Sequence, residues 1–298
     1  MKHLRTLQFI DVIARVGSIR KAADELAINS TALNRQILAF EEEFGFAVFE
    51  RLPRGVRLST AGELLIQHIR AQLADFARVR SQVADLSGVR RGHVSIAATR
   101  AALPYFLPLQ IATYRQTHTS VTFDVQQRDR SSAEESLLDY SADIALAFEP
   151  TQRSEFQTLI SVSQPAMVIM RATHPLARDK IVRLGHCLEY PLALPSASAG
   201  VRELLEQAAA TRSLRLEPEV ESESAQFLIS YVQREDLLTF DLPLGVSEDV
   251  LSALGLVARR LDSRDAPEGR LYLGQLRGRT LPVAAAKFAD QVQQKLAE

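Results

Sequence analysis

Residues 18–37 read SIRKAADELAINSTALNRQI, and this stretch decides the fold of the front of the chain. Its apolar residues return every three or four positions on both sides of a break at Ile28-Asn29, which is the spacing of two amphipathic helices. Ser18 is placed to cap the first helix, and Ser30 or Thr31 to cap the second. Two short helices joined by a tight turn predict a helix-turn-helix unit.

The second helix of such a unit presents its polar N-terminal face to the major groove of DNA. Ser30, Thr31, Asn34 and Arg35 occupy that face. Arginine forks onto guanine, asparagine onto adenine, and hydroxyls bond phosphates or base edges. The alternative is that Asn34 and Arg35 are ordinary solvated positions.

The segments around this unit favour DNA binding. Residues 4–16 have helical apolar spacing before Gly17, and residues 48–58 predict two short strands joined by a Pro-Arg-Gly turn. This hairpin carries Arg51, Arg54 and Arg57, which suit contacts to the phosphate backbone, although they are also compatible with a solvated surface. The sequence therefore predicts a winged helix-turn-helix over residues 1–58.

Residues 4–65 resemble the DNA-binding region of LysR-type transcriptional regulators. The resemblance rests on four blocks in the family's order, which read AADEL (22–26), ALNRQI (32–37), FER (49–51) and RGVRLSTAG (54–62). Ser30-Thr31 stands where members usually have Gln-Pro, and Asn34 where Ser is common. These departures leave the operator preference open.

A third segment, residues 59–88, predicts one long helix that ends at Gly88. Its apolar residues recur with a mean spacing of 3.5, which is that of a coiled-coil seam; they are Leu65, Ile69, Leu73, Phe76, Val79, Val83 and Leu86. The stripe must be covered either by the chain's own domains or by a second copy. The family resemblance implies a linker helix that pairs two subunits, as a homodimer or a homotetramer.

Residues 91–298 change to short β-rich segments that alternate with helices, which predicts a mostly parallel α/β sheet. The unit recurs after Pro191, so we expect two lobes. The family resemblance implies that the end of the chain returns to the first lobe, so that lobe I covers about 91–163 and 266–298 and lobe II about 164–265. The overall prediction is a mixed α and α/β chain whose C-terminal domain resembles a two-lobed periplasmic binding protein. The family resemblance, weaker here, implies that this domain binds an effector.

Ligands of doubly wound sheets lie where the carboxyl ends of strands meet helix N-termini. The residues placed there suit a small anionic metabolite between the lobes; they are Thr99, Arg100, Arg130, Ser131, Phe148, Ser196, Ser198 and Phe240, with Asp241 following the last of these. The alternative is that the serines merely cap helices and the arginines are solvated.

The charge balance agrees with this division. The chain has a formal net charge of -1, but residues 1–90 hold 13 Lys and Arg against 10 Asp and Glu, which leaves the remainder acidic. The basic part of the chain is therefore its front third, as a DNA-binding unit requires.

Three other functions, those of an enzyme, a free solute-binding protein and a redox sensor, are disfavoured by the sequence. The common hydrolase, zinc-protease, P-loop and dinucleotide motifs do not occur in the sequence, so we expect no enzyme, catalytic residue, metal or cofactor. A free solute-binding protein would need an export signal, and a redox sensor would need more than the single Cys187. We expect a cytoplasmic regulator, without membrane association, whose partners are double-stranded DNA, a small effector, a second copy of the chain and RNA polymerase.

Overall fold

The computed structural model describes residues 2–86, 91–128, 130–151 and 153–298. They form two compact units, Met1–Ser87 and Gly88–Glu298, and each is described by itself. Among the described residues, no helix has the length and apolar character needed to cross a membrane. The expected end of the long helix at Gly88 lies outside the described residues.

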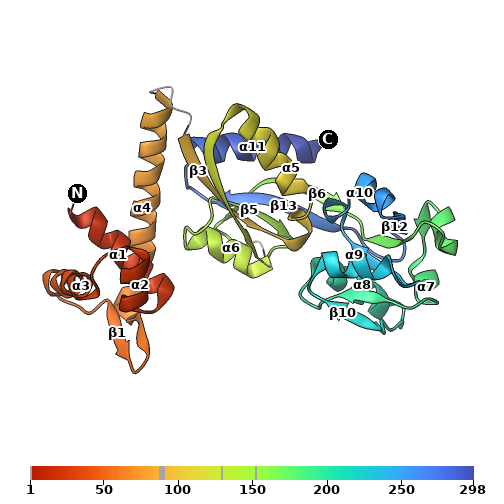
Figure 1. Ribbon diagram of the computed structural model, residues 1–298, viewed down its shortest axis with the longest axis horizontal. Helices are drawn as coiled ribbons and strands as arrows, with labels where there is room; N and C mark the ends of the chain where they lie inside the picture. The colour runs from red at the N-terminus through yellow and green to blue at the C-terminus, as the bar shows by residue number, and fades with distance from the viewer. Residues whose placement is uncertain (1, 87–90, 129, 152) are drawn as a thin grey trace. The chain divides into compact units, whose positions relative to one another are not determined.

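In its described residues, the first unit consists of four helices and one hairpin, whose arrangement can be followed in Figure 1. In chain order the elements are α1 (Lys2–Val16), α2 (Ile19–Glu25), α3 (Ser30–Phe44), β1 (Phe49–Leu52), β2 (Gly55–Leu58) and α4 (Thr60–Leu86). Gly17, at a φ of 67°, follows α1, and the Ser18 side chain accepts a hydrogen bond from the Lys21 amide to cap α2. The expected cap of α3 was wrong. Asn29, not Ser30 or Thr31, caps this helix, because its Oδ1 accepts from the Thr31 and Ala32 amides.

The core of this unit is formed where α1, α3 and the first half of α4 meet. Ile10, Leu33 and Ile69 are fully buried there, and each buried side chain of this size stabilises the fold by roughly 1.5–3 kcal/mol. Gly62 lets α4 pass against the hairpin, since a Cβ at this position would lie 2.1 Å from the Val48 carbonyl oxygen. The β1–β2 hairpin is thereby held against the three-helix core.

The apolar stripe of α4 is divided between two environments. Its first half covers the unit's own core, with Ile69 buried and Leu73 packed beside it. Its second half is exposed; Phe76, Val79 and Val83 are 46%, 42% and 58% exposed. Of the two coverings expected from the sequence, packing on the chain's own unit therefore applies to the first half of α4, and the second half stays exposed in the single chain.

The second unit begins with lobe I, which contains a five-stranded sheet of order β4-β3-β5-β13-β6. Strands β3, β4 and β5 are parallel, whereas β13 is antiparallel to both of its neighbours. The elements of lobe I are β3 (Arg91–Ala98), η1 (Arg100–Ala102), α5 (Phe106–Thr117), β4 (Ser120–Gln127), α6 (Arg130–Leu138), β5 (Ile144–Phe148), β6 (Phe156–Gln164), β13 (Gly269–Leu276) and α11 (Val283–Ala297).

Lobe II contains a four-stranded sheet of order β11-β7-β12-β8 and a parallel β10-β9 pair. A bridge between Leu192 and Leu238 joins the two groups of strands. The elements are β7 (Met167–Arg171), η2 (Pro175–Arg178), β8 (Ile181–Val182), α7 (Leu184–Cys187), β9 (Ala193–Pro195), α8 (Gly200–Thr211), β10 (Val220–Ser222), α9 (Ala225–Val232), β11 (Thr239–Asp241), η3 (Pro243–Gly245), α10 (Glu248–Ala253) and β12 (Leu256–Leu261). The chain passes from lobe I to lobe II between β6 and β7, and returns between β12 and β13 (Figure 1).

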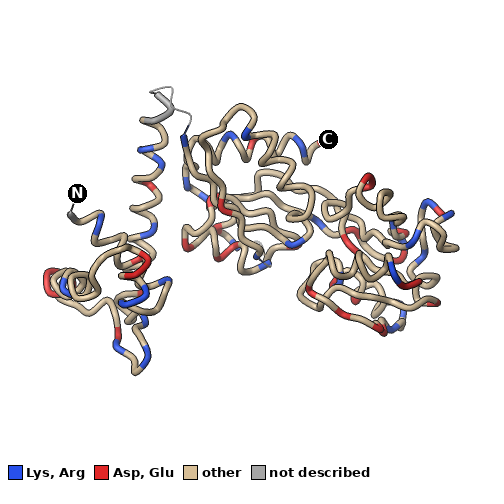
Figure 2. Tube along the Cα trace, viewed as in Figure 1, with Lys and Arg blue, Asp and Glu red and all other residues tan. Residues whose placement is uncertain are grey.

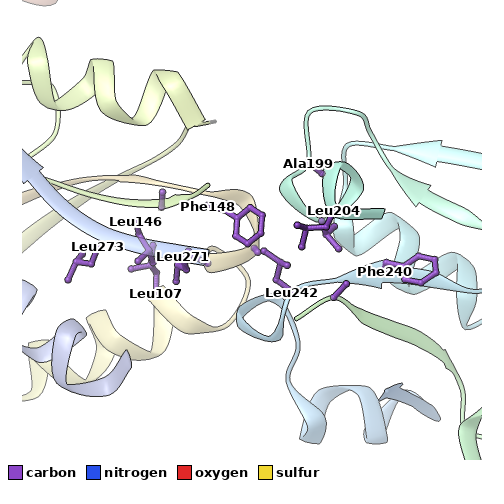
Figure 3. Close-up of a cluster of buried hydrophobic side chains, with 14 of the residues drawn as sticks. Leu107, Leu146, Phe148, Ala199, Leu204, Phe240, Leu242, Leu271 and Leu273 are labelled. Atoms are coloured by element: carbon purple, nitrogen blue, oxygen red, sulfur yellow. The ribbon is translucent and has the colours of Figure 1, made fainter. Parts of the chain in front are cut away.

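One hydrophobic cluster runs through both lobes. Phe148, at the end of β5, extends from lobe I toward Leu204 of α8, with Leu242 beside it (Figure 3). Its ring occupies a slot between two glycines, since a Cβ at Gly200 or Gly269 would lie 2.2 or 2.0 Å from ring carbons. The lobes therefore meet across a packed aromatic side chain.

Two features of this unit differ from the expected pattern. The sheets are mixed rather than mostly parallel, because β13 and β7 run against their neighbours. The strands β6, β8 and β12 were not expected from the sequence. The recurrence of a strand-helix unit after Pro191, in contrast, is present as β9-α8-β10-α9-β11.

Candidate functional site

The exposed polar face of α3 is the first candidate site. Ser30, Thr31 and Arg35 are exposed, whereas Asn34 is half-buried. Among the described residues Arg35 has no hydrogen bond or ion pair, so its whole guanidinium is available to a partner. Asn34 accepts a hydrogen bond from Arg51 of β1 at 3.4 Å, which links this face of α3 to the hairpin.

The hairpin places its three arginines differently. Arg54 lies exposed in the turn between β1 and β2, and none of the described residues pairs with it. Arg57 is opposite Glu50 in the β1–β2 register and donates to that carboxylate at 2.8 Å. Arg51 donates a hydrogen bond to the side-chain oxygen of Asn34. Arg54 is therefore the hairpin arginine with the least internal compensation of its charge.

Charges separate along this unit. Figure 2 shows basic residues on the β1–β2 hairpin and a run of acidic residues at the end of α3. That run is Glu41-Glu42-Glu43, and one Glu41 oxygen accepts the Val48 and Phe49 amides. The acid at this end of α3 thus helps to hold the hairpin, while the start of the helix remains free of carboxylates.

The second candidate site is a cleft between the lobes. Its volume is about 120 Å³. This is below the roughly 300–1,000 Å³ of sites for drug-sized ligands, so the cleft has room only for a small molecule. Thr99, Arg100, Ala101 and Gln127 line it from lobe I. The lining from lobe II consists of Ser198, Ala199, Gly200, Val201, Glu223, Asp241 and Leu242.

One wall of the cleft is the start of α8. Ala199 is the residue before this helix, and no side chain caps its N-terminus. The first amides of a helix lack partners within the helix and carry the positive end of its dipole. Ser198 lies beside them, with its hydroxyl 3.1 Å from that of Ser196. This wall can hold an anionic group.

Arg100 connects the two sides of the cleft. One of its terminal nitrogens donates to the Glu223 carbonyl oxygen at 2.6 Å, so a side chain of lobe I is bonded to the backbone of lobe II. The guanidinium retains further N–H groups for a ligand. It is also the only cationic side chain among the described residues that line the cleft, beside two carboxylates.

Asp241 is the buried one of these carboxylates, at 8% exposed. Its Oδ1 accepts the Leu242 amide at 2.8 Å. Burial raises the pKa of Asp241 to about 6, and the Leu242 hydrogen bond and the charge of Arg100 only partly oppose this rise. The carboxyl is therefore mostly ionised at neutral pH, at an energetic cost.

The cleft contains three of the expected ligand residues, Thr99, Arg100 and Ser198. The other five lie elsewhere. Arg130 binds the Glu203 carboxylate and the Glu149 carbonyl oxygen, and Ser131 is exposed on α6. Phe148 and Phe240 are each 2% exposed within the hydrophobic core, and Ser196, which does not line the cleft, has its hydroxyl 3.1 Å from that of Ser198.

Three further polar residues line the cleft; Gln127 and Glu223 were not expected there, and Asp241 was expected only as the residue after Phe240. Gln127 ends β4, Glu223 follows β10, and Asp241 ends β11. Strand alternation could have separated Asp241 from Phe240, because neighbouring positions on a strand point to opposite faces. No local signal indicates Glu223, which is brought to the cleft by the β9–β10 pairing.

The single cysteine does not suit redox chemistry. Cys187 is fully buried, and burial, with a smaller contribution from the charge of Asp265, raises its pKa to about 12. Since the thiolate is the reactive form, this thiol is inert in the folded chain. In the described ranges, no group of three His, Cys, Asp or Glu side chains is arranged to hold a metal ion.

Comparison with known families gives two matches. The family described as "LysR substrate binding domain" matches residues 87–297, and the family described as "Bacterial regulatory helix-turn-helix protein, lysR family" matches residues 4–63. Together they account for nearly the whole chain.

Individual proteins agree with these matches. The RuBisCO operon transcriptional regulator of Allochromatium vinosum is 27% identical over 297 residues, which cover 97% of this chain and 95% of that protein. A full-length OxyR cysteine variant from Pseudomonas aeruginosa has a similar fold, with a TM-score of 0.73, 17% identity and coverage of 97% and 94%. Full-length CbnR complexed with its target DNA gives a TM-score of 0.55, 15% identity and coverage of 98% and 99%.

Proposed function

The chain belongs to the LysR family of bacterial helix-turn-helix regulators, and from this premise we propose that α3 and the β1–β2 hairpin read an operator under the control of a ligand in the interlobe cleft. It is a DNA-binding transcriptional regulator and not an enzyme. We assign DNA reading to residues 1–58, subunit pairing to 59–88 and effector binding to 91–298. A regulator that reads an operator on the bacterial chromosome acts in the cytoplasm, because the chromosome lies there.

The observation that carries the DNA assignment is the exposed, unpaired Arg35 on the polar face of α3. Its full set of donors suits the O6 and N7 acceptors of guanine. Asn34, Ser30 and Thr31 extend the same face, and Arg54 in the hairpin turn suits a phosphate. Arg51 and Arg57 are each already hydrogen-bonded to a neighbouring side chain. We therefore assign them to the positive electrostatic potential of the hairpin rather than to base contacts.

Pairing of two subunits is supported by the exposed half of α4. Phe76, Val79 and Val83 recur at coiled-coil spacing on a helix whose other half is already covered. Pairing through them gives one assembly two copies of α3, which suits a near-palindromic operator. A pair of recognition helices multiplies the affinity of each.

We assign the effector site to Thr99, Arg100 and Ser198 with the start of α8. Uncapped helix amides, a hydroxyl and an arginine are the groups that bind a carboxylate or another small oxyanion. The size of the cleft suits a metabolite rather than a peptide.

The DNA assignment is tested by retrieving genomic fragments with the full-length protein and by measuring the affinity for the fragments obtained. Arg35→Ala is expected to weaken specific binding by roughly tenfold or more and to relax the preference at one base pair. Arg54→Ala is expected to weaken binding to all sequences and to lower the salt dependence by about one phosphate contact. Arg178→Ala, which removes an exposed charge from η2 of the second unit, is the matched control.

The assignment fails if Arg35→Ala binds as tightly and as selectively as the native protein. It also fails if the native protein retrieves no fragment above background in low salt. The effector assignment is tested on the same full-length protein with a panel of small organic acids. Arg100→Ala should abolish their binding while Arg178→Ala, an exposed arginine of η2, leaves it unchanged.

A further inference from the structure

The Asp241 carboxyl is built into the cleft in a way that the anion site does not explain. It ends β11, is 8% exposed and lines the cleft. One of its oxygens, Oδ1, accepts the Leu242 amide. Among the described residues, nothing donates a hydrogen bond to the other oxygen, Oδ2. Because Asp241 is more than nine-tenths buried and its remaining exposed surface lines the cleft, Oδ2 is left to water or to a ligand that supplies a donor.

The loop after β11 is shaped around this carboxyl. Gly245 closes the short helix η3, and a Cβ there would lie 2.5 Å from Oδ2 and 2.8 Å from Oδ1 of Asp241. Any residue other than glycine at position 245 would displace the carboxyl. The fold thus provides a fitted place for a group whose burial is unfavourable.

Neither a structural role nor an ion pair accounts for the charge. The hydrogen bond from Leu242 requires only an acceptor, which an asparagine would supply equally. Arg100, whose charge acts on Asp241, is bonded to the Glu223 carbonyl oxygen rather than to this carboxylate. What an aspartate adds at this position is a strong acceptor that faces the cleft.

The cleft therefore has two subsites with different preferences, which we call its two poles. The start of α8, Ser198 and Arg100 favour an anion, whereas Asp241 favours a hydrogen-bond donor. A simple carboxylate satisfies the first pole and leaves the second without a donor. A molecule that carries both an acid and a donor satisfies both.

Resting on the effector site proposed above, we propose that Asp241 determines specificity by accepting a hydrogen bond from a hydroxyl or ammonium group of the effector. The effector class is then a small hydroxy acid or amino acid, with its carboxylate at the start of α8 and its donor at Oδ2. Gly245 is a positioning residue, because it does not touch the effector and acts only by leaving room for the Asp241 carboxyl.

The experiment is calorimetric titration of the full-length protein with matched acids. Malate, aspartate and succinate share a four-carbon diacid and differ in a hydroxyl, an ammonium or neither; lactate, alanine and propionate repeat the comparison in three-carbon acids. The native protein is expected to bind one donor-bearing member of a set about tenfold more tightly than the plain acid of that set. Comparing malate with aspartate, and lactate with alanine, identifies the donor.

Two variants test the residue and one controls for charge. Asp241→Asn is expected to reduce the preference for the donor-bearing acid to about twofold or less, with the affinity for the plain acid retained. Gly245→Ala is expected to do the same without changing any charge, and so provides an independent test if Asp241→Asn folds poorly. Asp249→Asn, an exposed acid of α10, should leave the preference intact.

The outcomes separate the two proposals. If no acid of either set binds at concentrations on the order of 10 mM, the anion site itself is wrong and the inference falls with it. If the acids bind but the native protein does not favour a donor-bearing member, only the role of Asp241 is overturned. The same holds if Asp241→Asn and Gly245→Ala lower the affinity for all acids equally.

Discussion

Replacing Asp241 by asparagine is expected to stabilise the protein in the absence of effector. The folded chain raises the pKa of this carboxyl from 3.8 to about 6, chiefly by burying it. Each unit of such a shift corresponds to about 1.4 kcal/mol, so ionised Asp241 destabilises the folded chain by about 3 kcal/mol at neutral pH. Asparagine keeps the acceptor for the Leu242 amide and removes the buried charge.

The raised pKa of Asp241 also fixes how its effect on stability changes with pH. The folded state holds the Asp241 proton up to a higher pH than the unfolded state does, so this group lowers stability as pH rises from about 4 to about 6. The stabilisation by Asp241→Asn should therefore be full above pH 7, decline below pH 6 and vanish near pH 4. For a domain of this size, about 3 kcal/mol raises the melting temperature by roughly 6–12 °C.

The assay is urea unfolding followed by circular dichroism across this pH range, since the chain contains no tryptophan. Asp265→Asn is the matched control with the opposite sign. Hydrogen bonds from Arg183 lower the pKa of Asp265, so its contribution to stability is present above the unfolded pKa and is lost as pH falls. The reasoning is refuted if Asp241→Asn is no more stable than the native protein at pH 7.5, or if its advantage is the same at pH 4 and pH 8.

Three further predictions concern other parts of the chain. Phe76→Glu should convert the paired subunit to a monomer in analytical ultracentrifugation, because it places a charge on the exposed apolar half of α4; unchanged mass would contradict the proposed pairing. Gly62→Ala should destabilise the first unit by about 1–3 kcal/mol, since the new Cβ meets the Val48 carbonyl, and thermal unfolding would measure the loss. Cys187 should react with a thiol reagent only after unfolding, because burial holds its pKa at about 12; rapid labelling of the native protein at pH 7.5 would be inconsistent with this.

The front of the chain was predictable because its signals are local. The apolar spacing within 4–44 and the Pro-Arg-Gly turn fix α1 to α3 and the hairpin from neighbouring residues alone. The wrong prediction for the cap of α3 also concerns a local signal, which was present in the sequence but misassigned. Asn29 was assigned to the break between helices, although asparagine is among the strongest N-cap residues.

The second unit was predictable in most of its elements, strands β6, β8 and β12 excepted, but not in their pairing. Periodicity indicates that a strand exists, whereas its partner is set by the tertiary fold. Strand β13, from the end of the chain, is antiparallel to both β5 and β6, and β7 is likewise antiparallel to its neighbours. A mixed sheet therefore replaced the expected parallel one.

The cleft shows the same division between local and distant signals. Thr99 and Arg100 follow the first strand directly, so the rule for carboxyl ends of strands places them correctly in the cleft. Phe148 obeys the same rule and is nevertheless buried, because Gly200 and Gly269, both distant in sequence, leave a slot for its ring. No property of the residues around Phe148 indicates that slot.

The contacts between the lobes bear on how a ligand alters this regulator. The lobes are joined by Phe148 in its slot, by the bond from Arg100 to Glu223, and by the ion pair of Arg130 with Glu203. A ligand shifts the equilibrium between two arrangements only by the difference in its affinity for them. An acid held by the start of α8 alone contacts lobe II in any arrangement and has little such difference. One that also engages Arg100 of lobe I bridges both lobes, so its binding favours the arrangement in which Arg100 and Asp241 lie in one cleft.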